Sequence, residues 1–288
     1  MNMKLFVAHL LVIVLFVSCK QDAKEIKKSS DEIVLLDHDP VVKSKNEMPK
    51  SLPILFRSGD HKLVGRVLMA HGSNAKPTVI FLHGNPGFEK NEETGQFLRR
   101  QGYNTVFFSY SGTWGNEGVF NYKNSIEDIK SLVIYLKRNA KYFRIDTSKI
   151  SLCGHSMGAD IAILGGKEIE GLNTIISIDP WDAYNALQSK SEEELNQYIS
   201  NVEKRPCIKL SSGADFVNEI IFNQEMSLET ALHSNVSFHI FSSKELEMAF
   251  KEHHKDIADV NIHVLHACDH SFSDKRMELA KVIIKSLQ

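Results

Sequence analysis

The sequence predicts an α/β protein with a mostly parallel, doubly wound sheet and helices on both of its faces. Strand patterns alternate with helix patterns along most of the chain, which is typical of this architecture. Several strand patterns are continuous apolar runs, as expected for strands that are buried on both faces. A glycine-framed serine motif also stands where one strand passes into a helix. With 288 residues and no internal repeat, the chain favours one large domain.

Eight segments have strand character and four have helix character outside one irregular region. The first two strands, around residues 54–56 and 63–68, flank turn residues Ser58-Gly59-Asp60. The other strands are Thr78–Leu82, Asn104–Tyr110, Lys149–Cys153, Thr174–Ile178, Ser237–Phe241 and Asn261–Leu265. The helices are Asn91–Gln101, Ser125–Asn139, Ala159–Leu164 and about Asp274–Leu287, identified from apolar residues at helical spacing and from end signals such as Gly102.

The irregular region, residues 181–235, follows the sixth strand and is longer than one crossover requires. It contains helical stretches at Glu192–Val202 and Asn218–Leu232. We predict a helical insertion at the carboxyl edge of the sheet, which acts as a lid, or cap, or as a wall of a substrate pocket. The alternative is an ordinary pair of crossover helices.

The first 50 residues have the pattern of an exported, anchored protein. Lys4 precedes the apolar run Leu5–Val17, which is too short to span a membrane comfortably and predicts a signal peptide over residues 1–18. Ser18-Cys19 resembles the end of a bacterial lipobox, so we expect lipidation of Cys19, a polar tether over residues 19–50, and a domain over residues 51–288. The expected location is the bacterial cell envelope, facing the periplasm or the exterior. Plain cleavage beside an incidental cysteine is the alternative.

Charge and cysteine content bear on the expected partners and on disulfide bonding. The net charge of -2 favours neither nucleic-acid binding nor an acidic substrate. Once Cys19 is lipidated, three cysteines remain of the four, so no disulfide framework is implied.

The serine motif is Gly154-His155-Ser156-Met157-Gly158, which fits the pattern G-x-S-x-G. It follows a strand and opens a helix, the setting in which a sharp turn projects a nucleophilic hydroxyl from the sheet edge. The backbone N–H of Met157 would then lie at a helix N-terminus, where it suits a developing oxyanion. The competing interpretation of Ser156 is a helix cap at a tight turn.

A second loop, His83-Gly84-Asn85-Pro86-Gly87, follows the strand Thr78–Leu82. Its glycines allow the backbone to approach a substrate closely, so we predict the N–H of Asn85 as the second oxyanion donor. Taken alone, this segment is only a turn.

Position selects the general base among thirteen histidines. His270 lies between the last strand and the last helix, at the same sheet edge as Ser156, and is our candidate. We expect the turn to direct His155 elsewhere, and we expect His253 and His254 to be solvated. A metal cluster of His263, His266 and His270 would require all three to converge, so no metal is predicted.

The acid that orients the base should end the strand before the one that precedes His270. We select Glu245, which follows the strand Ser237–Phe241. The alternatives are Asp179 and Asp182, which follow the preceding strand, and Asp215 in the insertion; Glu245 would then only begin an exposed helix.

Four segments together resemble bacterial α/β-hydrolases of the dienelactone-hydrolase and prolyl-oligopeptidase-like neighbourhood, over about residues 52–287. They are residues 83–87, residues 108–115, the turn at Ser156, and residues 269–274. The resemblance implies Ser156 as nucleophile, His270 as base, and backbone donors at Asn85 and Met157. It also implies that the segment from Tyr110 to Trp114 lines the substrate pocket.

The implied function is hydrolysis of a carboxylic ester or related acyl bond through an acyl-enzyme, without a cofactor. The expected partners are a small-molecule ester or peptide substrate and the membrane that holds the lipid anchor. Two alternatives are a serine peptidase and a catalytically silent surface lipoprotein that binds a ligand.

Overall fold

The computed structural model describes residues 44–232, 237–254 and 261–288. The predicted signal peptide, Cys19 and most of the predicted tether lie outside these residues. The described part of the tether forms a 3₁₀ turn, Lys45–Glu47, and the first strand begins at Lys50.

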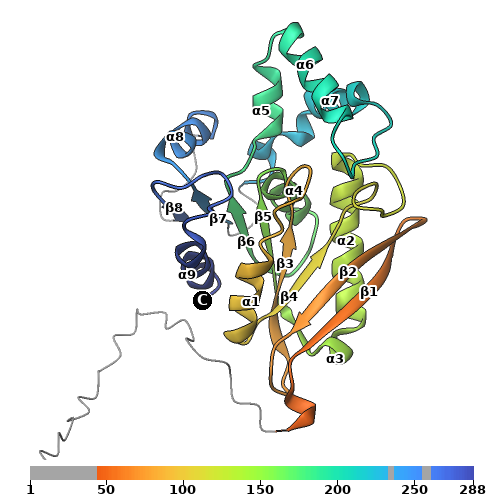
Figure 1. The fold of residues 1–288 in the computed structure, drawn as a ribbon, viewed down its shortest axis with the longest axis vertical. Helices are drawn as coiled ribbons and strands as arrows, with labels where there is room; N and C mark the ends of the chain where they lie inside the picture. Colours follow the sequence, from red (N-terminus) through yellow and green to blue (C-terminus); the bar gives the residue numbers. More distant parts are fainter. Residues whose placement is uncertain (1–43, 233–236, 255–260) are drawn as a thin grey trace, which may run out of the picture. The chain divides into compact units, whose positions relative to one another are not determined.

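The core of the fold is an eight-stranded sheet with the order β1-β2-β4-β3-β5-β6-β7-β8 (Figure 1). β1 pairs antiparallel with β2, and β2 antiparallel with β4, while all the other pairs are parallel. The strands are β1 (Lys50–Ser58), β2 (His61–Met69), β3 (Lys76–Leu82), β4 (Asn104–Phe108), β5 (Ile145–His155), β6 (Leu172–Ile178), β7 (Ser237–Phe241) and β8 (Ile262–Val264).

The order reverses at β3, because β4 lies on one side of this strand and β5 on the other. In open α/β sheets the crevice at such a reversal is the usual ligand site. Both loops that carry the predicted oxyanion donors leave strands β3 and β5 at this point.

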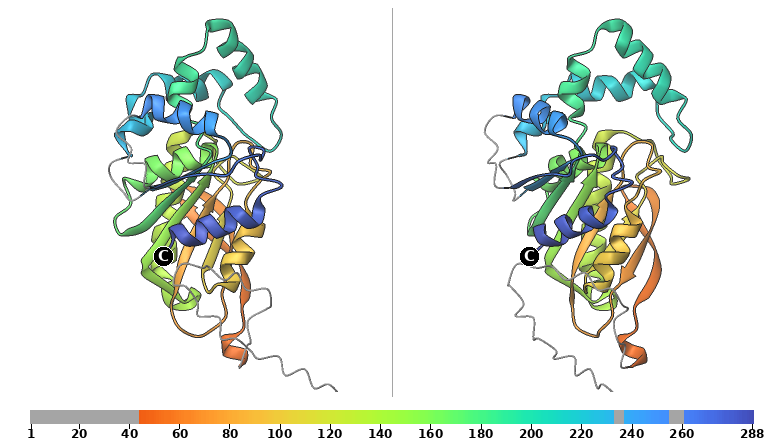
Figure 2. Two further views of the ribbon diagram at one scale, coloured as in Figure 1. Left: turned by 90° about the vertical axis from the view of Figure 1, so that its left-hand side faces the viewer. Right: turned by 60° about the vertical axis from the view of Figure 1, so that its left-hand side comes forward.

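Helices cover both faces of the sheet. The helices of the described residues are α1 (Glu92–Arg100), α2 (Tyr122–Arg138), α3 (Ala140–Phe143), α4 (Met157–Gly166), α5 (Ala183–Gln188), α6 (Glu192–Glu203), α7 (Gly213–Ile221), α8 (Lys244–His253) and α9 (Arg276–Ser286). Figure 2 shows α1 and α9 together against one face. α2 and α4 pack against each other over the opposite face.

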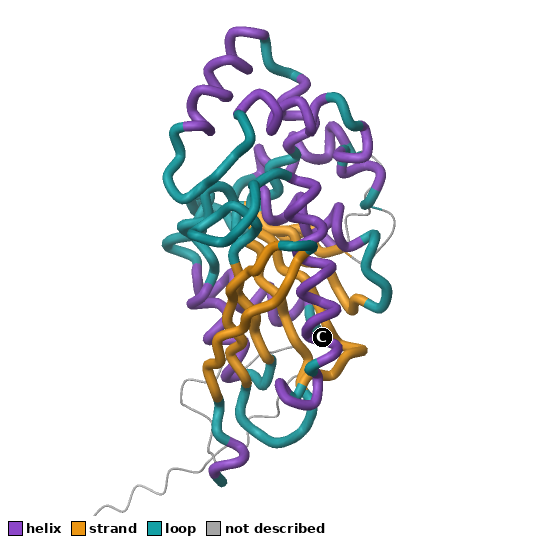
Figure 3. The backbone as a smooth tube through the Cα atoms, turned by 90° about the vertical axis from the view of Figure 1, so that its right-hand side faces the viewer, coloured by secondary structure: helices purple, strands orange, loops and turns teal. Residues whose placement is uncertain are grey.

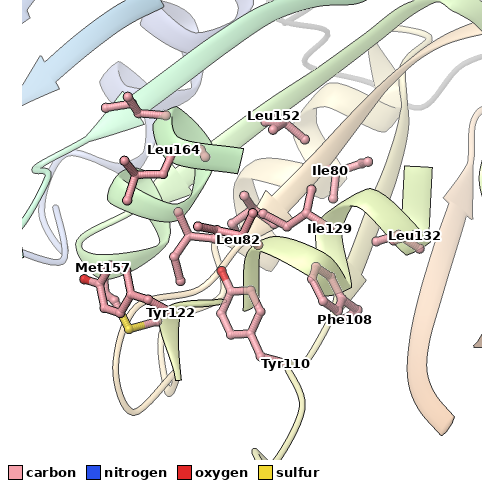
Figure 4. Packing of buried hydrophobic residues seen from close by; sticks show 14 of the residues in the cluster. Ile80, Leu82, Phe108, Tyr110, Tyr122, Ile129, Leu132, Leu152, Met157 and Leu164 are labelled. Atoms are coloured by element: carbon pink, nitrogen blue, oxygen red, sulfur yellow. The ribbon is translucent and has the colours of Figure 1, made fainter. Parts of the chain in front are cut away.

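Alternation along β3 explains why both faces are covered. Val79 and Phe81 belong to the apolar cluster under α1 and α9, whereas Ile80 and Leu82 belong to the larger cluster under α2 and α4 (Figure 4). Since successive side chains of a strand point to opposite faces, a strand that is apolar at every position requires a helical layer on each side.

The insertion after β6 forms three helices, α5, α6 and α7, followed by two 3₁₀ turns, and it lies beyond the ends of the central strands (Figure 3). It is therefore a helical insertion and not an ordinary crossover pair. Its second helix matches the expected Glu192–Val202. The expected helix at Asn218–Leu232 is wrong in its bounds, because the Ser212 hydroxyl accepts a hydrogen bond from the N–H of Asp215 and starts α7 earlier.

The predicted fold class is confirmed: a mostly parallel sheet lies between two helical layers, with the insertion after the sixth strand. In the described ranges, no helix is both long and apolar enough to cross a membrane. Cys153, Cys207 and Cys268 are unpaired there.

Candidate active site

Ser156 occupies a strained turn between β5 and α4. Its φ of 57° and ψ of -126° lie in a region that L-residues rarely adopt. The Ser156 N–H donates to the carbonyl of Ile178 at 2.9 Å, which fixes the turn to the end of β6. The surrounding structure thus holds the backbone geometry expected of a nucleophile turn.

The two glycines of the motif are required by close backbone packing. A Cβ at Gly154 would lie 2.0 Å from the carbonyl oxygen of Gly158, and a Cβ at Gly158 would lie 2.2 Å from the carbonyl oxygen of Leu82. A side chain at either position would push apart β3, β5 and the start of α4.

Ser156 and His270 line the same small cavity, of about 190 Å³. The cavity is formed by three segments that are far apart in sequence: residues 84–89 after β3, residues 155–156, and residues 270–271 after β8. Within the described residues, the Ser156 hydroxyl and the His270 imidazole do not form a hydrogen bond, and such contacts are often long before substrate binds. None of the lining residues belongs to the insertion.

His270 is oriented by Asp179. Nδ1 of His270 lies 3.1 Å from Oδ2 of Asp179, whose side chain is 1% exposed. The same carboxylate accepts hydrogen bonds from the N–H and the hydroxyl of Ser242. Since the carboxylate can only accept, Nδ1 of His270 carries a proton, and in the neutral imidazole Nε2 is the acceptor.

The selection of Glu245 as the partner of His270 is therefore corrected to Asp179. Glu245 lies in the first turn of α8, and its side chain is exposed. Hydrogen bonds from its own backbone N–H and from Ser243 lower the pKa of its carboxyl group. Glu245 thus supports the beginning of a helix, the alternative role considered for it.

The strand register explains why Asp179 reaches the site. His155 of β5 pairs with Ile178 of β6, so Ser156 and Asp179 leave neighbouring parallel strands at the same level. The Asp179 N–H donates to the carbonyl of Ile240 at 2.8 Å, which anchors it to β7 as well. An acidic residue directly after an apolar strand was the sequence signal for this position.

The other two candidate acids lie elsewhere. Oδ2 of Asp182 lies 3.0 Å from Nε2 of His254, and Asp215 is exposed on α7. The expectation that His254 is solvated is wrong, because its side chain is 1% exposed. Asp182 instead links the start of the insertion to the end of α8.

The loop after β3 is held by hydrogen bonds from the side chains of His83 and Trp114. Nδ1 of His83 donates to the carbonyl oxygen of Gly84 at 2.7 Å, and burial lowers the His83 pKa to about 4, so this ring stays neutral. Nε1 of Trp114 donates to the carbonyl of Pro86 at 2.8 Å. Asn85 lines the cavity, and its buried side-chain amide has no hydrogen-bond partner among the described residues.

The prediction that Tyr110 and Trp114 line the pocket is corrected. Tyr110 is fully buried in the core (Figure 4), and its hydroxyl donates to the carbonyl of His83 at 3.3 Å. Trp114 contacts Phe88, with 5.2 Å between ring centroids, and Phe88 is the aromatic residue that lines the cavity. Both predicted residues therefore support the loop that forms the pocket.

His155 is directed toward the site and not away from it. Its Nε2 lies 2.7 Å from the carbonyl oxygen of His270, and the two ring centroids are 4.7 Å apart. Sequence reasoning missed this contact, because it joins residues that are far apart in the chain.

For metals, the part of the chain that the structure describes contains no group of three or more His, Cys, Asp or Glu side chains that could hold an ion.

Comparison with known proteins shows which fold this is. The BD-FAE family model matches residues 67–204. No curated protein matches the sequence.

Three solved structures illustrate the structural likeness. Est1E from Butyrivibrio proteoclasticus, with ferulic acid bound, is 16% identical, with a TM-score of 0.64 over 81% of this chain and 99% of that one. A hyperthermophilic esterase from the archaeon Pyrobaculum calidifontis is 15% identical, with a TM-score of 0.59 over 84% and 86%. The thermostable carboxylesterase EstE1 from a metagenomic library is 14% identical, with a TM-score of 0.59 over 84% and 91%.

The sheet order, the strained serine turn after β5 and these structural neighbours agree: the chain has the α/β-hydrolase fold.

Proposed function

We propose that this protein is a serine hydrolase that cleaves a carboxylic ester through an acyl-enzyme intermediate. One observation carries the proposal: Ser156, on a strained turn, shares a cavity with His270, whose Nδ1 is bonded to the buried carboxylate of Asp179. A hydroxyl, an imidazole with its acceptor nitrogen free and an orienting carboxylate are the three groups that activate a serine.

The chemistry follows from these roles. Nε2 of His270 takes the proton of Ser156 as its oxygen attacks the ester carbonyl, and Asp179 stabilises the imidazolium that forms. The N–H groups of Asn85 and Met157 stabilise the oxyanion. His270 then gives the proton to the leaving alcohol, and water repeats the sequence to release the acid and restore the Ser156 hydroxyl.

An ester substrate is favoured over a peptide by the structural neighbours and by the cavity. Two of the neighbours described above are esterases by name, and the third, Est1E, has ferulic acid, a carboxylic acid, bound to it. The cavity of about 190 Å³ is small, and Phe88, which is 67% exposed, offers an aromatic surface at its rim. The contact between His270 and the buried carboxylate of Asp179 favours an active hydrolase over a catalytically silent lipoprotein.

Ser156→Ala is expected to abolish both labelling by a fluorophosphonate probe and hydrolysis of p-nitrophenyl acetate, with kcat lower by about 10⁶-fold. The reason is that the attacking oxygen is gone while the cavity stays intact. Gel fluorescence and release of p-nitrophenol measure the two effects.

Ser271→Ala is the matched control, because Ser271 is the other serine that lines this cavity. It should keep its labelling. A folded wild-type protein that is neither labelled nor active on esters would contradict the proposal. A protein that hydrolyses chromogenic peptides and not esters would instead be a serine peptidase.

We also propose that the protein is a lipoprotein of the bacterial cell envelope, anchored through Cys19. The support is the leader pattern in the sequence. In a bacterial host fed an alkyne fatty acid, the full chain should incorporate the label and sediment with membranes, and Cys19→Ser should do neither. Cys207→Ser, which changes an exposed cysteine of the domain, should behave as wild type. Incorporation that persists in Cys19→Ser would exclude this anchor.

A further inference from the structure

His155 connects the serine turn to the loop that carries the base. It is the last residue of β5, directly before Ser156, and it is 5% exposed. Its Nε2 lies 2.7 Å from the main-chain carbonyl oxygen of His270. The rings of His155 and His270 lie 4.7 Å apart with an angle of 38° between their planes.

Hydrogen bonding and burial determine which nitrogen of the His155 ring carries a proton. A carbonyl oxygen can only accept, so Nε2 of His155 carries the proton. Burial, followed by the neighbouring His270, lowers the His155 pKa to about 4, while the carboxylates of Asp179 and Glu89 oppose this shift. Nδ1 is therefore unprotonated at neutral pH, and this buried atom has no partner among the described residues.

Apart from the bond from His155, few contacts fix the position of His270 within its loop. The His270 side chain is 54% exposed, and its ring is held at Nδ1 by Asp179 alone among the hydrogen bonds of the described residues. Two residues later, Phe272 is fully buried and anchors the loop in the core. Between these points, the bond from His155 fixes the main chain of His270 to the serine turn.

We propose that His155 is a positioning residue, whose N–H holds the main chain of His270 at a fixed distance from Ser156. The serine turn and the base would then be joined twice: through the side chain of His270 by way of Asp179, and through its main chain by way of His155. This inference rests on the proposed function, because its effect is on the transfer of the Ser156 proton.

The consequence is a specific kinetic signature. His155 lines the cavity, but its bond goes to the main chain of His270, so losing the bond should disturb the Ser156–His270 geometry and leave ground-state binding nearly unchanged. A displacement of the order of 1 Å in such a pair costs about 10²-fold in rate. The effect should therefore appear in kcat, with little change in KM.

The test compares two substitutions at this position. His155→Phe keeps a flat ring and removes the donor, together with the unpartnered Nδ1. His155→Gln keeps a donor at the end of the same number of bonds from Cβ, because its Nε2 follows Cγ and Cδ as Nε2 of histidine follows Cγ and Cδ2. His155→Leu is a second variant without a donor, for use if the phenylalanine does not fit.

With p-nitrophenyl acetate, the Phe and Leu variants should lose about 10- to 100-fold in kcat and in the rate of fluorophosphonate inactivation, with KM within about threefold of wild type. The Gln variant should recover most of the rate, and all the folded variants should melt within a few degrees of wild type. A purely structural role would lower the melting temperature and would not separate Gln from Phe.

The proposal is overturned if a folded Phe or Leu variant turns over at the wild-type rate, or if Gln is as slow as Phe. In both cases, an active wild-type protein would still support the proposed serine-hydrolase function. A wild type without turnover or labelling overturns the function and this inference together.

Discussion

Asp179→Asn is expected to reduce kcat by about 10⁴-fold, with a folded protein and a nearly unchanged KM. The carboxylate of Asp179 accepts from the Ser242 N–H and hydroxyl and from Nδ1 of His270. In the variant, the oxygen of the amide can still accept from the Ser242 N–H, so its NH₂ group would face His270. The imidazole would then hold its proton on Nε2 and could not take the proton of Ser156.

Glu245→Gln is the matched control. It also converts a carboxylate into an amide, at the residue whose place in the sequence predicts the orienting acid. Glu245 is exposed in the first turn of α8, so turnover should stay within about twofold of wild type and stability should change by less than about 0.5 kcal/mol. Steady-state kinetics with p-nitrophenyl acetate and thermal melting measure both variants. A large loss in Glu245→Gln with little change in Asp179→Asn would reverse the assignment.

The choice between Glu245 and Asp179 could not be made from the local sequence pattern. Glu245 lies in the first turn of α8, which begins after Ser243, whose hydroxyl accepts from the N–H of Leu246. Asp179 follows an apolar strand directly. Both segments end at the same sheet edge, so chain position alone could not separate them; the register of β5 against β6 does.

The central strands were predictable because burial on both faces requires apolar residues at successive positions. β3, β5 and β6 are apolar on both faces, and each was predicted to within a few residues. The start of α7 in the second half of the insertion was not, since it depends on the cap at Ser212 and on packing against the core. Tyr110 was misplaced for a similar reason: its position after β4 is visible in the sequence, but the direction of its side chain is not.

Gly158→Ala is expected to lower stability by about 3 kcal/mol or more, which corresponds to a drop of about 6–12 °C in Tm, and to remove most activity. The added Cβ would lie 2.2 Å from the carbonyl oxygen of Leu82 and 2.6 Å from that of His83. These are backbone atoms at the end of β3, so no side chain can rotate away. Either α4 must move from the sheet or the loop that carries Asn85 must shift.

Gly165→Ala in the same helix is the control for the general effect of replacing a glycine. A Cβ there meets nothing closer than Cδ1 of Ile129, at 3.5 Å, which is ordinary van der Waals contact. Because alanine is favoured over glycine inside a helix by about 0.5–1 kcal/mol, this variant should melt at or above the wild-type temperature and keep its turnover. Calorimetry and ester turnover of the two variants measure the difference. Equal stability of both would mean that α4 does not press against the end of β3 as closely as the serine turn requires. The proposed oxyanion donors at Asn85 and Met157 would then lose their common support.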